Sequence, residues 1–494
     1  MGSRKVFLAA DIGAGSGRVI AGVLQDGKIS LEEVNRFDNP SIDLDGSLHW
    51  QSIGILSSIK EGLALAIKKY GDDVRSIGVD TWGVDYGFLD KRKRLLGVPY
   101  CYRDSRTEGM IEEANQTISA SERYAATGIQ PAPYNTLYQL LAEQKGGDSW
   151  LELAGDLLFM PDLINFWLSG VACNEVTIAS TSEMLDAKTG EWARELLFEF
   201  GFPKGIFESL VEPGVVLGPL TKSIQSEIGA SDLKVVTVPS HDTAAAVASC
   251  PFSSDKSIFI SSGTWSLMGI ESDEPFLTES ASESGLTNER GVEGTTRLLK
   301  NISGFWIFQE CKRDWDSKGV NLSYAELTDL AENAEPFKLF INPNDRRFMK
   351  PGKMLERIGA YLKETGQEVT EDPAAISRAI FEGLVFSYRE AIAGLEKVTG
   401  TQYDTINIIG GGSQNLIINQ FVADATGCRV IAGPIEGSSL GNILAQIKAE
   451  GDIDSIRAGR TIINDSFELP VFEPNDSNAW IEAEKKFKEI LGVE

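Results

Sequence analysis

A pattern of strand, glycine turn and strand that occurs twice constrains the fold of this chain more than any other feature of its sequence. Residues 6–11 form an apolar run that predicts a buried strand, and residues 13–18 (Gly-Ala-Gly-Ser-Gly-Arg) form a glycine-rich turn. The chain continues through a second strand, the turn dipeptide Asp26-Gly27 and a third strand at 28–37, which predicts a hairpin. A similar order begins at residue 257, about half a chain later. Two such copies indicate a duplicated domain rather than a run of short repeats.

The elements that follow each copy agree with this duplication. The first half is predicted to have a helix at about 50–69 and a strand at 76–83. The second half is predicted to have strands at 257–266, 267–271, 296–301 and 405–409, and helices at 305–315, 373–399, 416–426 and 478–491. Asp372 and Pro373 start the long helix as N-cap and first-turn proline, and Gly400 ends it. The last helix is expected to pack back on the body through one apolar face. The polar stretch 271–294 is expected to be a surface loop, with a mobile lid as the alternative.

Length and composition also indicate two domains of the α/β class. The chain has 494 residues, more than a single hydrophobic core usually serves, so we expect domains at 1–248 and 249–494. Its apolar content of 42% supports ordinary globular cores.

The charge of the chain excludes some partners. With 72 acidic and 46 basic residues, the formal net charge is −26, which opposes binding to the phosphates of nucleic acid or to anionic lipid. No apolar run approaches the roughly 18 residues of a spanning helix, and the first residues lead into a strand without a signal-peptide pattern. We therefore expect a cytoplasmic protein that binds neither nucleic acid nor membrane.

Cysteines and histidines exclude other kinds of site. The five cysteines are scattered and show no CxxC spacing, so they are expected to be reduced core thiols rather than disulfides or zinc ligands. The chain has only two histidines, His49 and His241, which excludes a metal site built from several histidines.

The first glycine turn has the chemistry of a phosphate site. Glycines at a strand-to-strand turn expose backbone N–H groups that an anion can approach, and Ser16 and Arg18 add a hydroxyl and a positive charge. Asp11, directly before the turn, suits a phosphate that carries Mg²⁺, held directly or through water. The alternative is a glycine-rich hairpin with a solvated acid. The spacing does not fit a dinucleotide-binding loop, and no P-loop sequence occurs in the chain.

An acid also lies where a strand-like run meets a small-residue helix, in Ser240-His241-Asp242-Thr243. One interpretation is that Asp242 or Thr243 caps the helix. A serine–histidine–aspartate triad is excluded because neighbours along one chain cannot align as nucleophile, base and orienting group. The third interpretation is a general base at the carboxyl end of a strand, where open α/β sheets bind ligands.

Two turns in the second half add weaker signals. Gly263 and the Thr264 hydroxyl follow a predicted strand and could hold the same phosphates. Gly410-Gly-Gly412 lies between a predicted strand and a helix, so its backbone could admit a nucleotide base or ribose. Such glycines also occur where a strand and a helix simply pack closely.

The order of these motifs resembles the actin and hexokinase superfamily, and within it the FGGY carbohydrate kinases, over nearly the whole chain. Among these kinases, the rhamnulokinases have the most similar motifs. The matching segments are Asp80-Thr-Trp-Gly-Val-Asp85, Tyr102-Arg-Asp-Ser-Arg106, Asn135-Thr-Leu-Tyr-Gln139, Met160-Pro-Asp162, Ser240-His-Asp-Thr243, Ser261-Ser-Gly-Thr-Trp-Ser-Leu-Met268, Leu299-Lys-Asn301 and Gly410-Gly-Gly-Ser-Gln-Asn415. The resemblance implies two duplicated ribonuclease-H-like domains with an ATP and sugar cleft between them.

The resemblance also implies roles for individual residues. It implies contact with the phosphates of ATP by Ala14, Gly15, Ser16, Gly17, Arg18, Gly263 and Thr264, and contact with its nucleoside by Gln309 and Gly411. It places Gly83, His241, Thr243 and Asn301 around the sugar, with Asp242 as the proton acceptor. Gly15 stands where the family often has a serine, which removes one hydroxyl but keeps the backbone donor.

The implied reaction is phosphorylation of the 1-hydroxyl of L-rhamnulose by ATP. Phosphoryl transfer depends on alignment and charge neutralisation, which Mg²⁺ and the two glycine turns would supply, and domain closure would exclude water. An aspartate is ionised at neutral pH and can act as the base without special tuning. Asp80, Trp82 and Asp85 suit a sugar pocket, and core packing is the alternative for each. Arg103 and Asp104 are expected to form an internal ion pair.

Two rival functions remain open from the sequence. The first is an FGGY kinase for another ketose, such as L-fuculose or xylulose. The second is a non-catalytic sensor of sugar or ATP. The chain is expected to act as a monomer or a homodimer.

Overall fold

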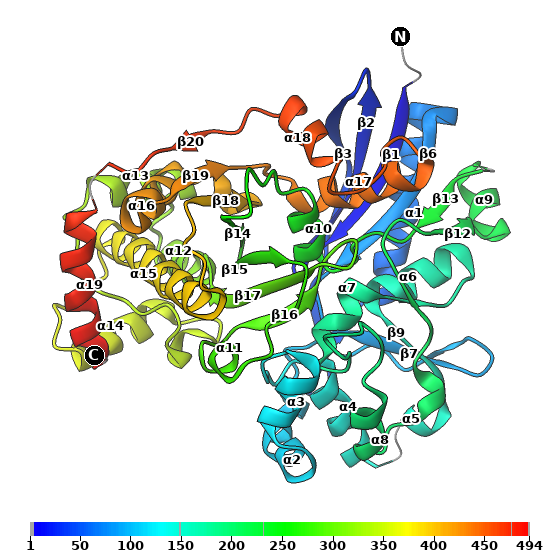
Figure 1. The fold of residues 1–494 in the computed structure, drawn as a ribbon, viewed down its shortest axis with the longest axis horizontal. Helices are drawn as coiled ribbons and strands as arrows, with labels where there is room; N and C mark the ends of the chain where they lie inside the picture. The colour runs from blue at the N-terminus through cyan, green and yellow to red at the C-terminus, as the bar shows by residue number, and fades with distance from the viewer. Residues whose placement is uncertain (1–3, 148–149, 231, 476, 493–494) are drawn as a thin grey trace. The chain divides into compact units, whose positions relative to one another are not determined.

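The computed structural model describes residues 4–147, 150–230, 232–475 and 477–492. The chain forms two compact units, each built from more than one segment (Figure 1). Unit 1 comprises Met1–Pro251, Glu271–Leu298 and Glu436–Glu468, and unit 2 comprises Phe252–Ile270, Leu299–Ile435 and Leu469–Glu494. Two segments of the second half of the sequence thus pack in the unit formed by the first half.

Unit 1 is built on a sheet with the strand order β12-β13-β6-β1-β2-β3. Its strands are β1 (Lys5–Ile12), β2 (Ser16–Gln25), β3 (Lys28–Asp38), β6 (Val74–Thr81), β12 (Val216–Pro219) and β13 (Lys234–Val236). The β1–β2–β3 meander is antiparallel, whereas β6 pairs parallel to β1 and β13 parallel to β6. The predicted hairpin around Asp26-Gly27 is confirmed, with both residues at positive φ.

Helices cover both faces of this sheet, which explains why β1 is continuously apolar from Val6 to Ala10. Val6 and Leu8 point to the core that α1 (Ser52–Tyr70), α6 (Met160–Ser169) and α9 (Lys222–Ile228) cover, while Phe7 and Ala9 point to the core beside α17 (Gly437–Glu450). Helix α10 (Asp242–Ala248) packs tightly on α17, because a Cβ at Gly441 would lie 1.8 Å from a carbonyl oxygen of α10.

The remainder of unit 1 holds a smaller sheet, β8-β7-β9, and a second core of aromatic and aliphatic side chains. Its short elements are β4 (Ser41–Leu44), β5 (Ser47–Trp50), β7 (Tyr86–Asp90), β8 (Leu95–Leu96), β9 (Ala154–Phe159), β10 (Asn174–Glu175), β11 (Leu210–Val211), β16 (Thr287–Arg290), α2 (Met110–Thr117), α3 (Ala120–Thr127), α4 (Thr136–Lys145), α5 (Trp150–Leu153), α7 (Val176–Ala179), α8 (Arg194–Glu199), α11 (Glu279–Glu283) and α18 (Arg460–Ser466). Single 3₁₀ turns lie at η1 (Gly71–Asp73), η2 (Ser105–Thr107), η3 (Ser180–Ser182) and η4 (Lys204–Ile206).

The second sheet has the strand order β16-β17-β15-β14-β18-β19-β20, and from β17 to β20 it repeats the strand order of the first sheet. The strands are β14 (Ser257–Ser262), β15 (Trp265–Ser272), β17 (Thr296–Ser303), β18 (Thr405–Ile409), β19 (Arg429–Ala432) and β20 (Val471–Phe472). As in unit 1, the first two strands form an antiparallel hairpin and the next two strands along the sheet pair parallel. The predicted duplication and the α/β class are confirmed.

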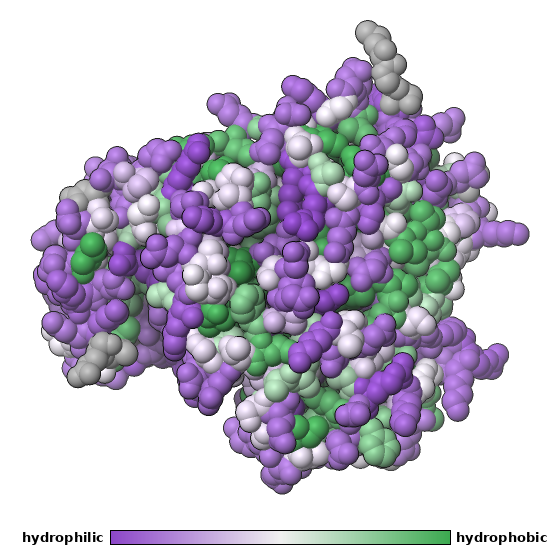
Figure 2. Space-filling model, viewed as in Figure 1, coloured by the Kyte–Doolittle hydropathy of each residue, from purple (hydrophilic) through white to green (hydrophobic). Residues whose placement is uncertain are grey.

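The helices of unit 2 are α12 (Trp306–Ser317), α13 (Tyr324–Asn333), α14 (Met354–Glu364), α15 (Pro373–Thr399), α16 (Leu416–Thr426) and α19 (Asn478–Leu491), with 3₁₀ turns η5 (Arg346–Phe348) and η6 (Gly411–Gln414). Helix α15 starts as predicted, since the Asp372 carboxylate accepts the Ala375 N–H at 3.1 Å, and Gly400 ends it at φ 69°. Helix α19 packs back on α15, with the ring centroids of Phe487 and Phe386 4.8 Å apart. Its outer surface is mostly hydrophilic (Figure 2).

One prediction is wrong. The stretch 271–294 is not simply a surface loop or lid, because it contains α11 and β16 and packs within unit 1. Thr287, Asn288 and Glu289 are buried there, and the Tyr124 hydroxyl donates to the carbonyl of Leu286 at 2.9 Å. Buried polar residues bonded to distant segments leave no apolar pattern that would reveal the strand.

All five cysteines are free and buried, as expected for reduced core thiols. Among the described residues, no helix is both long and apolar enough to cross a membrane.

Candidate active site

The first glycine turn of unit 1 connects β1 and β2. Its backbone is fixed by a hydrogen bond from the Gly13 N–H to the Ser16 carbonyl at 2.9 Å and by Asn39, whose side chain donates to the Gly13 carbonyl at 2.9 Å. Gly15 and Ser16 are exposed, and a Cβ at Gly15 would meet no atom within 4 Å. The turn is therefore held rigidly at its base and is open at its tip, where an anion can approach.

Asp11 and Arg18 form an ion pair beneath this turn. Arg18 Nη2 lies 2.9 Å from Asp11 Oδ2, and Arg18 Nη1 lies 2.6 Å from the Glu436 carboxylate. Burial alone would lower the pKa of Arg18, but the two carboxylates outweigh it and raise that pKa. The Ser439 hydroxyl also donates to Asp11 Oδ2, at 2.8 Å. Arg18 is thus bonded to two acids, so a phosphate at this turn would have to compete with at least one of them.

Asp80, at the end of β6, lies beside Asp11 in the register of the sheet. Its side chain is fully buried, and Oδ2 accepts a hydrogen bond from Asn442 at 2.6 Å while Oδ1 has no partner among the described residues. Burial raises the pKa of Asp80 well above its ordinary value, and the charge of Asp11 adds to this rise. Asp80 is therefore a buried acid that is bonded to α17 through Asn442.

Asp85 is also fully buried and forms the centre of an aromatic cluster. Its carboxylate accepts hydrogen bonds from the indoles of Trp50 and Trp82 at 2.5 and 2.9 Å, from the Gln139 amide at 2.9 Å and from the Tyr102 N–H at 3.1 Å. These four bonds occupy the carboxylate, which leaves Trp82 fixed with its ring 4.2 Å from that of Trp50. Asp85 and Trp82 therefore shape the region around Gly83 from beneath.

The expected ion pair between Arg103 and Asp104 is not formed among the described residues. Asp104 instead accepts the N–H groups of Leu48 and Arg106, at 2.7 and 2.9 Å. Arg103 stacks on the ring of Tyr102, 4.7 Å from its centroid.

The chain brings Gly83 and His241 together, although they are far apart in the sequence. The Thr81 N–H donates to the Ser240 carbonyl at 2.8 Å, and a Cβ at Gly83 would lie 3.4 Å from His241 Nε2. A larger residue than glycine would press on this histidine. Behind them, the buried Glu175 carboxylate accepts the Ser240 N–H at 3.1 Å and fixes the backbone that leads to Asp242.

Asp242 is the first residue of α10, and His241 is its N-cap. Asp242 Oδ1 accepts two hydrogen bonds, from the Thr243 N–H at 2.6 Å and from the Thr243 hydroxyl at 3.3 Å, and His241 Nε2 lies 3.4 Å from the same oxygen. Among the described residues none donates to Oδ2. The side chain is 35% exposed. Burial raises the pKa of Asp242 and the charge of Asp11 adds to the rise, while His241 opposes it. The capping alternative is wrong, since His241 is the N-cap and makes no side-chain cap hydrogen bond; the Asp242 carboxylate accepts only from the adjacent Thr243, and one oxygen remains available.

Two charged residues near His241 were not predicted from the sequence to belong to the site. Glu289 Oε2 lies 3.2 Å from His241 Nδ1, and Arg297 Nη2 lies 3.3 Å from the same nitrogen. Glu289 was assigned to a surface loop and Arg297 to an ordinary strand, and no local pattern marks either as part of a site. Glu436, Ser439 and Asn442, on or next to α17, were missed for the same reason.

Unit 2 carries the second group of predicted residues. Gly263 and Thr264 form the turn between β14 and β15, and the Thr264 hydroxyl donates to the Gln309 side chain at 3.3 Å. Asn301 is exposed in β17. The structure thus connects Thr264 to Gln309 directly.

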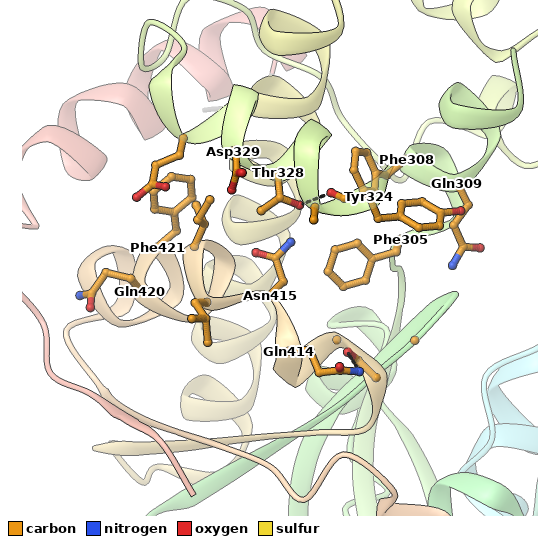
Figure 3. Close-up of a pocket in the computed structure, with 17 residues that line it drawn as sticks. Phe305, Phe308, Gln309, Tyr324, Thr328, Asp329, Gln414, Asn415, Gln420 and Phe421 are labelled. Carbon is orange, nitrogen blue, oxygen red and sulfur yellow. Dashed lines mark hydrogen bonds between the residues drawn. The ribbon is translucent and has the colours of Figure 1, made fainter. Parts of the chain in front are cut away.

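A cavity of about 890 Å³ lies in unit 2 over α12, α13 and α16, and both Gln309 and Gly411 line it (Figure 3). Phe305 and Phe308 supply aromatic surface near Gln309, while Gln420 and Phe421 lie at the other end. The volume and the mixture of aromatic and amide side chains suit a nucleoside. In η6, a Cβ at Gly411 would meet no protein atom within 4 Å, whereas a Cβ at Gly412 would meet the Ser262 side chain at 2.0 Å.

Comparisons with known proteins agree with this arrangement. The chain matches the N-terminal domain of the FGGY family of carbohydrate kinases over residues 6–249 and the C-terminal domain of that family over residues 258–450. The chain belongs to the FGGY family of carbohydrate kinases. It is 41% identical to the rhamnulokinase of Bacteroides thetaiotaomicron over 98% of this chain and 99% of that protein. It is 41% identical to the rhamnulokinase of Oceanobacillus iheyensis over 94% of this chain and 97% of that protein.

The fold of this FGGY kinase matches solved structures as well. The gluconate kinase from Lactobacillus acidophilus superimposes with a TM-score of 0.82 at 17% identity and covers 99% of this chain and 98% of that chain. The predicted membership of the FGGY carbohydrate kinases and the predicted two-domain fold are therefore confirmed. The chain is a sugar kinase, with ATP as the phosphoryl donor that the family uses.

Proposed function

We propose that this kinase transfers the γ-phosphate of ATP to the 1-hydroxyl of L-rhamnulose, as a step in L-rhamnose catabolism. The support is the full-length similarity, at about 40% identity, to proteins named rhamnulokinase. The observation that carries the chemistry is Asp242, whose Oδ1 accepts two hydrogen bonds from Thr243 and lies 3.4 Å from His241 Nε2, while Oδ2 accepts none among the described residues. A carboxylate held by one oxygen presents the other to a substrate hydroxyl.

Asp242 acts in this proposal as the general base. It accepts the proton of the attacking hydroxyl as the new P–O bond forms, and the bond to ADP breaks. A base with a raised pKa holds the proton more strongly once it is transferred, provided that it is ionised at the start. Burial and the charge of Asp11 act in this direction on Asp242.

We propose that the sugar contacts Gly83, His241, Thr243 and Asn301. The proximity of Gly83 to His241 supports the first two. Asp80, Trp82 and Asp85 act from beneath, since the carboxylates are fully buried and Trp82 donates its indole N–H to Asp85. They fix the shape of the pocket, on which discrimination between ketoses depends.

We propose that the nucleoside of ATP occupies the cavity lined by Gln309 and Gly411, and that its phosphates contact Gly263, Thr264 and the turn from Ala14 through Gly15, Ser16 and Gly17 to Arg18. The hydrogen bond between Thr264 and Gln309 supports a continuous path from nucleoside to phosphate. The exposed tip of the first turn, at Gly15 and Ser16, supports anion binding there.

The residues present fit a Mg²⁺ ion that arrives with the nucleotide. Asp11 Oδ2 is bonded to Arg18 and Ser439, but no hydrogen bond from a described residue reaches Oδ1. The described residues hold no cluster of three ligating side chains, as is usual for Mg²⁺ sites that rely on one or two carboxylates and substrate phosphates. When bound, the ion would neutralise charge on the transferring phosphoryl group. Asp11 would hold it, directly or through water.

A second candidate function is an FGGY kinase for another ketose, such as L-fuculose or xylulose, because the motifs do not fix the stereochemistry of the sugar. A sensor without turnover is a more distant alternative. The decisive experiment is a panel of ketoses in an ADP-release assay, with and without Mg²⁺. We expect Mg²⁺-dependent turnover with the highest kcat/KM for L-rhamnulose. A higher kcat/KM for another ketose would overturn the substrate, and turnover with none would overturn catalysis.

We further propose a cytoplasmic location and a monomer or homodimer. The five free thiols support a reducing compartment. Sedimentation analysis of the purified chain would exclude this assembly if it showed a larger oligomer.

A further inference from the structure

Two buried charged residues, Glu289 and Arg297, lie directly behind the histidine that precedes Asp242. Arg297 is fully buried and Glu289 nearly so. Arg297 Nη2 lies 3.0 Å from Glu289 Oε2, and its Nε donates to the Arg290 carbonyl at 3.0 Å. Burying an arginine–glutamate pair costs desolvation free energy, which the attraction between the two charges often only offsets. A gain in stability therefore does not by itself account for this pair.

The nitrogens of His241 face different partners. Nδ1 faces Arg297 Nη2 at 3.3 Å and Glu289 Oε2 at 3.2 Å, whereas Nε2 faces Asp242 Oδ1 at 3.4 Å. A guanidinium can only donate hydrogen bonds, so Nδ1 can accept from Arg297 only when it carries no proton. A proton on Nδ1 would instead donate to Glu289. The tautomer of His241 therefore depends on which of the two partners bonds Nδ1.

The geometry favours Arg297 as that partner. The contact from Arg297 Nη2 to Nδ1 satisfies hydrogen-bond geometry, whereas Glu289 Oε2 has no partner in such geometry among the described residues. Burial alone would raise the pKa of Glu289, but the charge of Arg297, together with the contact of Glu289 with His241, outweighs it and lowers that pKa, which keeps Glu289 ionised. Glu289 thus balances the charge of Arg297, and Arg297 bonds the ring. In neutral His241 the proton is then on Nε2, which faces Asp242.

We infer that Arg297, held by Glu289, is a positioning residue that fixes His241 as the Nε2–H tautomer and so directs the Asp242 carboxylate. The two donors of Thr243 bond Asp242 Oδ1 and Nε2–H faces the same oxygen from 3.4 Å, which leaves Oδ2 for the substrate hydroxyl. With the other tautomer, Nε2 would present its lone pair instead of a proton to Asp242 Oδ1. The catalytic part of this inference rests on the proposed role of Asp242 as the base, but the tautomer itself does not.

The chain offers an internal standard for measuring the tautomer. Its only other histidine is His49, whose Nδ1 lies 2.9 Å from the Val98 carbonyl oxygen. A carbonyl can only accept, so neutral His49 must carry its proton on Nδ1. The ring nitrogens of ¹⁵N-histidine-labelled protein, recorded by NMR at about pH 8 where an ordinary histidine is neutral, should therefore show two opposite tautomers. A His49→Asn variant assigns the two signals.

We expect opposite tautomers of His241 in two variants. In Arg297→Met the donor is lost, and Nδ1–H should donate to Glu289, so the tautomer changes. In Glu289→Gln the arginine donor remains, and the Nε2–H tautomer should persist. We expect Arg297→Met to lower kcat about 10²-fold through misplacement of the base, with the KM for ATP changed by no more than about 2-fold.

Arg123→Met is the matched control. Arg123 and Glu183 are a second fully buried pair in unit 1, 2.8 Å apart. This variant should lower Tm to a similar extent but keep the tautomer of His241 and the kcat of the folded enzyme. If neutral wild-type His241 carries its proton on Nδ1, or if Arg297→Met keeps the Nε2–H tautomer, the inference is wrong. It is also wrong if Arg123→Met and Arg297→Met lose kcat equally.

The kinetic arm uses whichever ketose the substrate panel selects, so an incorrect sugar does not affect it. If Asp242→Asn kept full turnover, the proposed base would fail while the measured tautomer still stood. The two failures are therefore distinguishable.

Discussion

Replacing Gly411 with alanine is a sharp probe of the nucleotide cavity. Gly411 is the first residue of η6 and lines the cavity, and a Cβ built there meets no protein atom within 4 Å. Unlike Gly410, which has φ 85°, it does not adopt a left-handed conformation. Alanine is therefore tolerated by the protein itself, and any penalty arises only when a ligand occupies the cavity.

Gly411→Ala is expected to change fold stability and nucleotide affinity in opposite directions. Alanine at an unstrained glycine position stabilises a fold by about 0.4–1 kcal/mol through the unfolded chain. A methyl group added to an occupied, closely packed site costs about 1–3 kcal/mol. This cost raises the dissociation constant by roughly 5- to 150-fold. Gly411→Ala should therefore weaken nucleotide binding while Tm stays constant or rises.

Titration calorimetry with ADP and differential scanning calorimetry measure these two effects on one sample. The KM for the sugar should remain near that of the wild type. Gly412→Ala is the contrasting variant, because its Cβ would lie 2.0 Å from the Ser262 hydroxyl oxygen and should lower Tm. Binding of ADP to Gly411→Ala within about 2-fold of the wild type would refute the placement of the nucleoside in this cavity.

Three further predictions test other parts of the site. Asp85→Asn should lower the free energy of unfolding by about 1–3 kcal/mol, because one of the two acceptor oxygens becomes an NH2 group that cannot accept from the donors around it; chemical denaturation measures this, and an unchanged midpoint would contradict it. Burial raises the pKa of Glu175 from 4.5 to about 7. The folded chain therefore keeps this proton to higher pH than the unfolded chain, and the unfolding free energy should fall by about 3 kcal/mol as pH rises through that interval. Glu175→Gln should remove this part of the slope, and an identical slope would exclude Glu175 as its source. Asp11→Asn should raise the Mg²⁺ concentration for half-maximal turnover about 10- to 100-fold without weakening metal-free ADP, and an unchanged Mg²⁺ requirement would exclude Asp11 as the ligand.

The sequence predicted the parts of the fold that local patterns determine. The hairpin at Asp26-Gly27, the cap at Asp372 and the end of α15 at Gly400 each depend on residues adjacent in the chain, and each is confirmed. The strand in the segment 271–294 was missed because its buried residues Thr287, Asn288 and Glu289 are polar. Some contacts of the segment reach residues more than a hundred positions away, as with Tyr124 and Leu286. No periodicity in a single sequence records such pairing.

The candidate site divides in the same way. His241 and Asp242 could be recognised together because they are neighbours in one strand-to-helix joint. The partner of Asp11 on α17, Ser439, lies 428 positions away, and the charged pair behind His241 is formed by residues that have no motif of their own. Burial also separates acids that look alike in the sequence. Asp85 is fully buried with four hydrogen bonds, whereas Asp242 is 35% exposed with one open oxygen.

The turnover of Asp242→Asn with L-rhamnulose and Mg-ATP tests the central claim most directly. Asparagine keeps the size of the side chain but cannot accept the proton of the sugar hydroxyl. The account predicts that kcat falls about 10²- to 10⁴-fold, while ADP binds as it does to the wild type. A kcat equal to that of the wild type would contradict the assignment of Asp242 as the base.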